Sequence, residues 1–205
     1  MIITLLTSAS KEYWPLLETG LPSKNEYCLR HNIQLQTRIH QNMGNPWGER
    51  EIFMINALHT CDWLWFMGAD TLIMNHTIDA RKFIDEDYDF IIGVDYNGIN
   101  NDTFLLRNCE KSFEFLFKVI SYNTSLPDDQ EAMKRCIEEM PEFRVKKVSQ
   151  KLFNAYLYDS EPEYATYPKN LEGNFRDGDF VLHLAGIYEE RMFKLLKEYT
   201  LRIVR

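Results

Sequence analysis

The sequence predicts a single α/β domain over residues 1–205, with a central, mostly parallel β-sheet flanked by α-helices. Short β-rich runs alternate along the chain with longer segments of helical periodicity, which is typical of this fold class. The runs at residues 2–6 and 63–67 are apolar almost throughout, as expected for strands that are buried on both faces. No repeat, low-complexity tract or linker divides the chain into two domains.

Composition restricts the partners that this chain can have. Hydrophobic residues make up 45% of the sequence and aromatic residues 14%, as in a globular protein. The formal net charge of -8 argues against a nucleic-acid partner or an anionic membrane surface, because both need a basic footprint. No segment approaches the ~18 apolar residues that span a bilayer. We therefore expect small molecules or neutral glycans as partners, and no membrane span.

The cysteines and the first residues predict a cytoplasmic location. The four cysteines are scattered and form no Cys-X-X-Cys pair, which indicates free thiols in a reducing compartment. Residues 1–6 have no basic region and no cleavage site, and the charged pair Lys11 and Glu12 follows soon after. We therefore expect these residues to form a first strand and not a signal peptide.

The strongest sign of a functional site is the end of the second apolar run. This run stops at Gly68, Ala69 and Asp70, which places a carboxylate at the carboxyl end of a buried strand. Open α/β sheets bind ligands at that edge. Glycine lets a ligand approach the backbone, and the carboxylate suits a divalent cation that neutralises a diphosphate. The alternative is a solvated aspartate in a turn.

Small side chains after the first strand indicate a nucleotide subsite. We expect Thr7, Ser8 and Ala9 in a loop whose backbone groups can meet a base or a ribose. Tyr13 is close enough to stack on that base, although it could instead cover the sheet. Arg50 lies near the beginning of a predicted amphipathic helix, where it could reach a phosphate or sugar or simply remain solvated.

Polar residues also surround the next predicted strand. Asp95 ends the strand expected at residues 89–94, and its carboxylate could accept hydrogen bonds from sugar hydroxyls. Residues 99–108 are expected to form a polar loop that leads into another strand. Residues 156–176 are aromatic and irregular, which is more typical of a binding loop than of a regular element.

Two further positions can be read in either of two ways. Asp128, Asp129 and Gln130 open a helix, where acids are favoured as caps and by the helix dipole, so Asp129 could be catalytic or the acids could only cap the helix end. His183 lies in an apolar strand near the end of the chain, where most histidines are satisfied core residues. It could instead join Asp70 in a metal site, since Mn²⁺ accepts both oxygen and imidazole ligands.

Four blocks in this order resemble glycosyltransferase family 34, the GMA12/MNN10-type galactosyl/xylosyltransferases. They are Trp-Leu-Trp-Phe-Met-Gly-Ala-Asp at 63–70, Ile-Asn-Asn-Asp-Thr-Phe-Leu-Leu-Arg-Asn-Cys at 99–109, Asp-Asp-Gln-Glu-Ala-Met at 128–133 and Gly-Asp-Phe-Val-Leu-His-Leu-Ala-Gly at 178–186. The resemblance covers roughly residues 47–186. It implies the GT-A fold, a Rossmann-like domain that binds a nucleotide sugar and uses Mn²⁺ or Mg²⁺.

The resemblance also implies roles for particular residues. Asp70 and His183 match the metal ligands of the family. The other matches are Gly186 at the diphosphate, Asn100 and Asn101 along the donor sugar, Asp129 and Gln130 beside the anomeric carbon and, less closely, the sugar-binding acid Asp95 and the base-stacking Tyr13. The family motif has an acid where this chain has Gly68, so we expect one contact to the metal or ribose to be missing.

From this resemblance we predict a metal-dependent, retaining glycosyltransferase. It would move a sugar from a UDP-sugar donor to a hydroxyl of a glycan or glycoprotein acceptor. One alternative is a degenerate nucleotide-sugar-binding module, which Gly68 in place of an acid would explain. A sugar nucleotidyltransferase is less consistent with the sequence, because residues 7–12 contain no glycine-rich loop that could hold a triphosphate.

Overall fold

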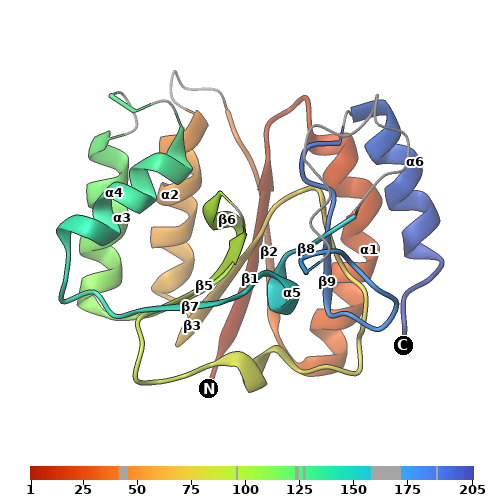
Figure 1. Ribbon diagram of the computed structural model, residues 1–205, viewed down its shortest axis with the longest axis horizontal. Coiled ribbons are helices and arrows are strands. Elements are labelled where there is room, and N and C mark those ends of the chain that lie inside the picture. The colour runs from red at the N-terminus through yellow and green to blue at the C-terminus, as the bar shows by residue number, and fades with distance from the viewer. Residues whose placement is uncertain (42–45, 96, 123–124, 127, 158–171, 188) are drawn as a thin grey trace.

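The computed structural model describes residues 1–41, 46–95, 97–122, 125, 126, 128–157, 172–187 and 189–205. Its main sheet has six strands, all parallel except β6, which runs antiparallel to both of its neighbours (Figure 1). In order across the sheet they are β2 (Gln34–Ile39), β1 (Ile3–Ala9), β3 (Trp63–Met67), β6 (Gly98–Arg107), β5 (Phe90–Asp95) and β7 (Val145–Ser149). The predicted α/β class with a mostly parallel sheet is therefore confirmed.

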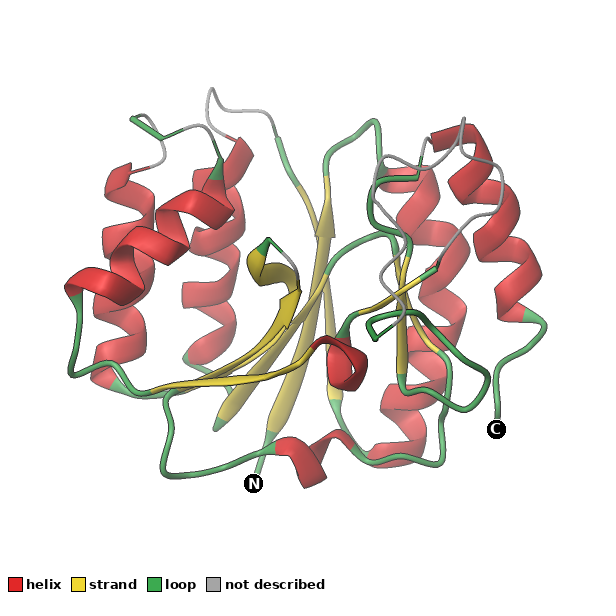
Figure 2. Ribbon diagram, in the orientation of Figure 1, coloured by secondary structure: helices red, strands yellow, loops and turns green. Residues whose placement is uncertain are grey.

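Helices cover both sides of this sheet (Figure 2). One side carries α2 (Pro46–Leu58), α3 (Glu110–Tyr122) and α4 (Asp129–Glu139). The other side carries α1 (Trp14–His31), α6 (Glu189–Thr200), the short helices η1 (Ala80–Phe83) and α5 (Gln150–Phe153), and a second sheet. In this second sheet β9 (Val181–His183) lies between β4 (Thr71–Ile73) and β8 (Ala155–Tyr156). The predicted histidine strand thus lies beside the main sheet and not within it.

The apolar runs form the centre of the molecule because both faces of the main sheet are covered. Successive residues of β3 point to opposite faces, so Leu64 and Phe66 pack under α2, α3 and α4. Trp63, Trp65 and Met67 pack on the other side. All five side chains are buried, which explains why this strand is a continuous apolar run without alternation.

Two segments that the sequence predicted as loops are strands. β1 continues through Thr7 and Ser8 to Ala9, because Ala9 still pairs with Ile39 of β2. Residues 99–102 belong to β6, where Ile99 pairs with Val94. In both segments the backbone hydrogen bonds to neighbouring strands outweigh the local preference of small and polar residues for loops. Of the binding loop expected at 156–176, residues 158–171 lie outside the described residues.

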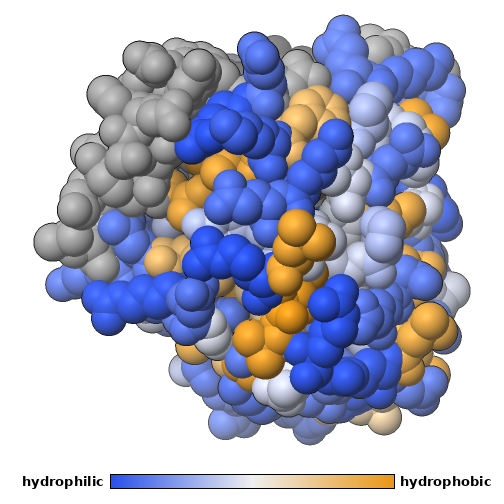
Figure 3. Space-filling model, turned by 90° about the vertical axis from the view of Figure 1, so that its right-hand side faces the viewer, coloured by the Kyte–Doolittle hydropathy of each residue, from blue (hydrophilic) through white to orange (hydrophobic). Residues whose placement is uncertain are grey.

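The face formed by α1 and α6 is mostly polar, with a few apolar side chains between the charged ones (Figure 3). Leu29, Leu201 and Val204 are among the exposed apolar residues of the chain. In the part of the chain that the structure describes, no helix is both long enough and apolar enough to cross a membrane.

Candidate active site

A cavity of about 360 Å³ lies at the carboxyl ends of β1 and β3, where the sequence predicted ligand binding. Eight of the predicted site residues line it: Ser8, Ala9, Tyr13, Arg50, Gly68, Ala69, Asp70 and Asp129. Tyr13 is 46% exposed, so much of its ring is accessible from solvent. Predicted site residues that are far apart in the sequence, from Ser8 to Asp129, therefore meet in one cavity.

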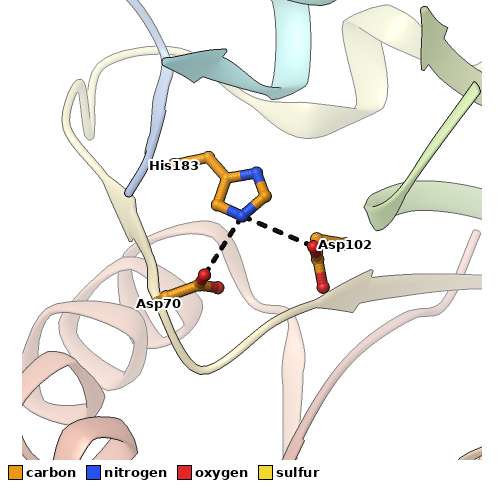
Figure 4. Close-up of side chains that lie close together, drawn as sticks. All are labelled: Asp70, Asp102 and His183. Atoms are coloured by element: carbon orange, nitrogen blue, oxygen red, sulfur yellow. Dashed lines mark hydrogen bonds and ion pairs between the residues drawn. The ribbon is translucent and has the colours of Figure 1, made fainter. Parts of the chain in front are cut away.

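A cluster of two carboxylates and one imidazole lies at this cavity (Figure 4). Asp70 follows β3, Asp102 lies on β6 and His183 ends β9. The His183 Nε2 atom is 3.2 Å from Asp70 Oδ2 and 3.4 Å from Asp102 Oδ2. One ligand atom from each residue lies within 4.8 Å of the other two, which is close enough for all three to hold one cation. The two residues that the resemblance implied as metal ligands are thus neighbours.

The imidazole of His183 is held in a fixed orientation. Its Nδ1 atom is hydrogen-bonded to the side-chain oxygen of Asn154, and both residues are almost fully buried. An amide oxygen can only accept, so Nδ1 carries the hydrogen and Nε2 faces the two carboxylates. The ring of Tyr156 packs edge-on against the imidazole at 5.3 Å. This arrangement leaves Nε2 as the ring atom that can bind a cation.

Burial and the charges of the three residues shift the pKa of each member of the cluster. Burial lowers the pKa of His183, but the negative charge of Asp70 outweighs it and raises that pKa above its usual value. Burial raises the pKa of Asp70, yet the charge of His183 brings it below the usual range. The pKa of Asp102 is raised to about 6 by burial and by the nearby charge of Asp70. A divalent cation would therefore replace a proton on binding.

Asp102 was not predicted as a site residue. It is near the ligands because β3 and β6 are antiparallel and Met67 pairs with Thr103, which places Gly68 opposite Asp102. The Gly68 N–H donates to the Asp102 carbonyl oxygen at 2.7 Å. A signal was present in the sequence, since an acid follows two asparagines in the family block while an expected acid is absent at position 68. Only the strand register connects these two positions.

Arg50 lies buried beneath the cavity and not on the surface. Its Nη1 atom is 2.8 Å from Asp129 Oδ2, and its Nη2 atom is 3.0 Å from Glu51 Oε1. Burial lowers the pKa of Arg50, but the charges of Asp129 and Glu51 have the larger combined effect and raise the pKa overall, so the guanidinium stays charged. Asp128 caps α4 by accepting a hydrogen bond from the backbone N–H of Glu131 at 2.8 Å. The carboxylate of Asp129 is therefore not the cap and faces Arg50.

Four other predicted residues, Asp95, Asn100, Asn101 and Gln130, are not part of the cavity lining. The Tyr156 hydroxyl donates to Asp95 and accepts from the amide of Asn100 at 2.6 Å, so both residues are bound to tyrosine. The Asn101 N–H donates to the side-chain oxygen of Gln130 at 3.4 Å.

Two further predicted residues, Thr7 and Gly186, lie outside the cavity lining, whereas His40, which was not predicted, belongs to it. Thr7 is fully buried within β1 and does not line the cavity. Gly186 has φ of 69°, a left-handed conformation that favours glycine, three residues after His183. His40, which was not predicted, lines the cavity and places its Nε2 atom 2.9 Å from Ser8 Oγ. It follows the last residue of β2, so the rule that strand ends carry ligand-binding residues could have identified it.

Known proteins share both the sequence pattern and the fold. An uncharacterized alpha-1,2-galactosyltransferase of Schizosaccharomyces pombe is 23% identical over 85% of this chain, which spans 57% of that relative. The structure of a glycosyltransferase involved in glycosylation of the major capsid of PBCV-1 matches with a TM-score of 0.74 at 14% identity, over 97% of this chain and 100% of that one. A Drosophila β1,4-galactosyltransferase 7 variant in complex with manganese, UDP-Gal and xylobiose matches with a TM-score of 0.51 at 12% identity, over 72% and 65%.

These likenesses to solved structures show the GT-A glycosyltransferase fold. The family itself is shown by sequence, because the model of the galactosyl transferase GMA12/MNN10 family matches residues 81–194, more than half of the chain. That range includes Asp102, Asp129 and His183, whereas Gly68 and Asp70 lie before it. By this match the chain belongs to the galactosyl transferase GMA12/MNN10 family.

Proposed function

We propose that this chain transfers a sugar, with galactose as the first candidate, from a UDP-sugar to a hydroxyl of a glycan or glycoprotein. The observation that carries the proposal is the cluster of Asp70, Asp102 and His183 at the edge of a cavity large enough for part of a nucleotide sugar. Membership of a galactosyltransferase family and the alpha-1,2-galactosyltransferase relative support the choice of galactose.

The residues of the cluster fit Mn²⁺ or Mg²⁺. Two carboxylates and one imidazole are a donor set that Mn²⁺ accepts, and Asn154 orients the imidazole as a supporting residue would. The structurally similar Drosophila enzyme was crystallised with manganese. Asp70 and His183 would hold the cation, which when bound supplies positive charge to the departing diphosphate.

The other cavity residues would bind and orient the donor. Ser8, Ala9 and Tyr13 lie on the side formed by β1, where the accessible ring of Tyr13 can stack on the base. Gly68 and Ala69 let the donor approach the backbone near Asp70. Arg50 contacts the carboxylate of Asp129 at the cavity, where the carboxylate can stabilise positive charge developing at the anomeric carbon.

Two finer features of the proposal rest on other observations. Retention of configuration follows from the family resemblance, with Asp129 or Gln130 beside the anomeric carbon. The cytoplasmic location rests on the four cysteines, all of which are free thiols in the structure. Fractionation of cells that express the protein, followed by immunoblotting, would test the location.

Thermal melting with a panel of nucleotide sugars, each with and without Mn²⁺, tests the donor and the metal together. Ligand at a hundred times its Kd stabilises the folded state by about 2.7 kcal/mol, which corresponds to roughly 5–10 °C for a chain of this size. We expect a UDP-sugar to raise the midpoint only when Mn²⁺ is present, while GDP-mannose has no effect. If no UDP-sugar shifts the midpoint under either condition, the proposed function is wrong.

A further inference from the structure

Position 68 points directly into the metal-binding cluster. An ideal Cβ atom built on Gly68 would lie 3.0 Å from Asp102 Oδ1 and 3.0 Å from Asp70 Oδ1. Real Cβ atoms essentially never come closer than this, so a side chain there would occupy space that the two carboxylates already share. The space that a side chain at position 68 would take is occupied in part by the side chain of Asp102, which lies on β6.

The register between β3 and β6 explains how this happens. In an antiparallel pair, directly opposite residues place their side chains on the same face of the sheet. Gly68 is opposite Asp102, and the Asp102 Cβ atom lies only 3.5 Å from the ideal Cβ position of Gly68. A carboxylate on either residue would therefore point to the same place. Because residue 68 is glycine, the side chain of Asp102 can occupy this place.

We propose that Asp102 is the third metal-binding carboxylate and supplies from β6 the acid that is missing at position 68. Gly68 is then the matching half of the pair, since its lack of a side chain makes room for the Asp102 carboxylate. The inference rests on the proposed function, because it assigns a ligand to that same metal site. It also removes the reason to regard the chain as a degenerate binding module.

The exposure of the two carboxylates indicates that they bind a metal ion and do not only form a structural ion pair with His183. His183 is 1% exposed, but the side chain of Asp70 is 23% exposed and that of Asp102 39% exposed. Both carboxylates line the cavity, whereas the imidazole closes the cluster from the buried side. A cation bound by all three residues would thus remain open to a diphosphate on the cavity side.

Mn²⁺ titration in the presence of UDP, followed by the electron paramagnetic resonance signal of free Mn²⁺, tests the assignment without any turnover. Asp102→Asn keeps the shape of the side chain and should weaken Mn²⁺ binding about tenfold or more. The exposed Asp87→Asn loses the same charge outside the cluster and should bind like the wild type. Wild-type affinity in Asp102→Asn would overturn the inference and leave the proposed function intact. No Mn²⁺ binding by the wild-type protein would overturn both.

Exchange of the two residues tests the pairing itself. Gly68→Asp combined with Asp102→Gly moves the carboxylate across the strand pair and should restore Mn²⁺ affinity to within about threefold of the wild type. Asp102→Gly alone should remain weak. Weak binding by the exchanged variant, with a wild-type melting midpoint, would show that positions 68 and 102 are not equivalent.

A change of ligand chemistry at position 102 identifies direct contact with the metal. Thiolates prefer softer cations than carboxylates do, so Asp102→Cys should bind Cd²⁺ more tightly relative to Mn²⁺ than the wild type does. The matched control is Asp87→Cys, which should leave the ratio of the two affinities unchanged. An unchanged ratio in Asp102→Cys would mean that residue 102 does not touch the metal.

Discussion

Replacing Arg50 should destabilise the protein strongly, because it is the positive partner of a buried carboxylate. Arg50→Met retains an unbranched apolar side chain of similar length but removes the guanidinium that contacts Glu51 and Asp129. The side chain of Asp129 is 15% exposed and can regain some hydration, whereas the side chain of Glu51 is fully buried. The main cost therefore comes from leaving the fully buried Glu51 without the positive charge of Arg50.

The expected loss is about 3–5 kcal/mol, the range measured when one partner of a buried ion pair is removed. For a chain of this size it corresponds to a drop of roughly 6–20 °C in the melting midpoint. Urea denaturation measures the free energy of unfolding directly. The matched variant is Arg50→Met combined with Glu51→Gln, which also removes the buried negative charge that Arg50 balances and should regain at least half of the loss.

The same variant has a characteristic pH dependence. Burial already raises the pKa of Glu51, although Arg50 lowers it in part, so loss of Arg50 raises it further. Glu51 then binds a proton more tightly in the folded state than in the unfolded state. The free energy of unfolding of the variant therefore falls as pH rises from the unfolded-state pKa of Glu51 to its higher folded-state pKa. Arg50→Met should thus be less destabilised at low pH than at neutral pH. A loss below about 1 kcal/mol, or no recovery in the double variant, would refute this reasoning.

Three further perturbations test other parts of the structure. Asn154→Ala removes the hydrogen-bond partner of His183 and should lower Mn²⁺ affinity about 10–100-fold in the same titration, and unchanged affinity would contradict the orienting role. Mn²⁺ affinity should rise as pH rises, with proton release in calorimetry, because the raised pKa of His183 means that the cation displaces a proton. Burial raises the pKa of Asp89, but paired hydrogen bonds from Arg144 lower it overall, so this carboxylate stabilises the fold above its unfolded pKa and the effect disappears as pH falls. Asp89→Asn should cost about 1.5–3 kcal/mol at neutral pH and less below about pH 4, and an equal loss at both would contradict the pairing.

The sequence was sufficient to locate the cavity because strand ends are a local feature. The buried run before Asp70 ends abruptly, and parallel strands bring their carboxyl ends to one edge of the sheet. The same rule explains why Ser8 and Ala9 line the cavity even though they lie in a strand and not in the predicted loop.

Features that depend on pairing between distant segments could not be predicted. The place of Asp102 requires the register between β3 and β6, which no local pattern specifies. A charged residue such as Arg50 is usually exposed, and its burial depends on Asp129, which lies far away in the sequence. The strand of His183 was predicted, but its pairing with β4 and β8 in a second sheet was not.

The most direct test of the central claim is release of UDP from UDP-galactose, with and without Mn²⁺. The assay needs no acceptor, because a transferase also hydrolyses its donor slowly. We predict that the wild-type protein and Asp87→Asn release UDP only when Mn²⁺ is present, and that Asp70→Ala releases none under either condition. Unchanged turnover in Asp70→Ala would show that the cluster of Asp70, Asp102 and His183 is not the catalytic metal site.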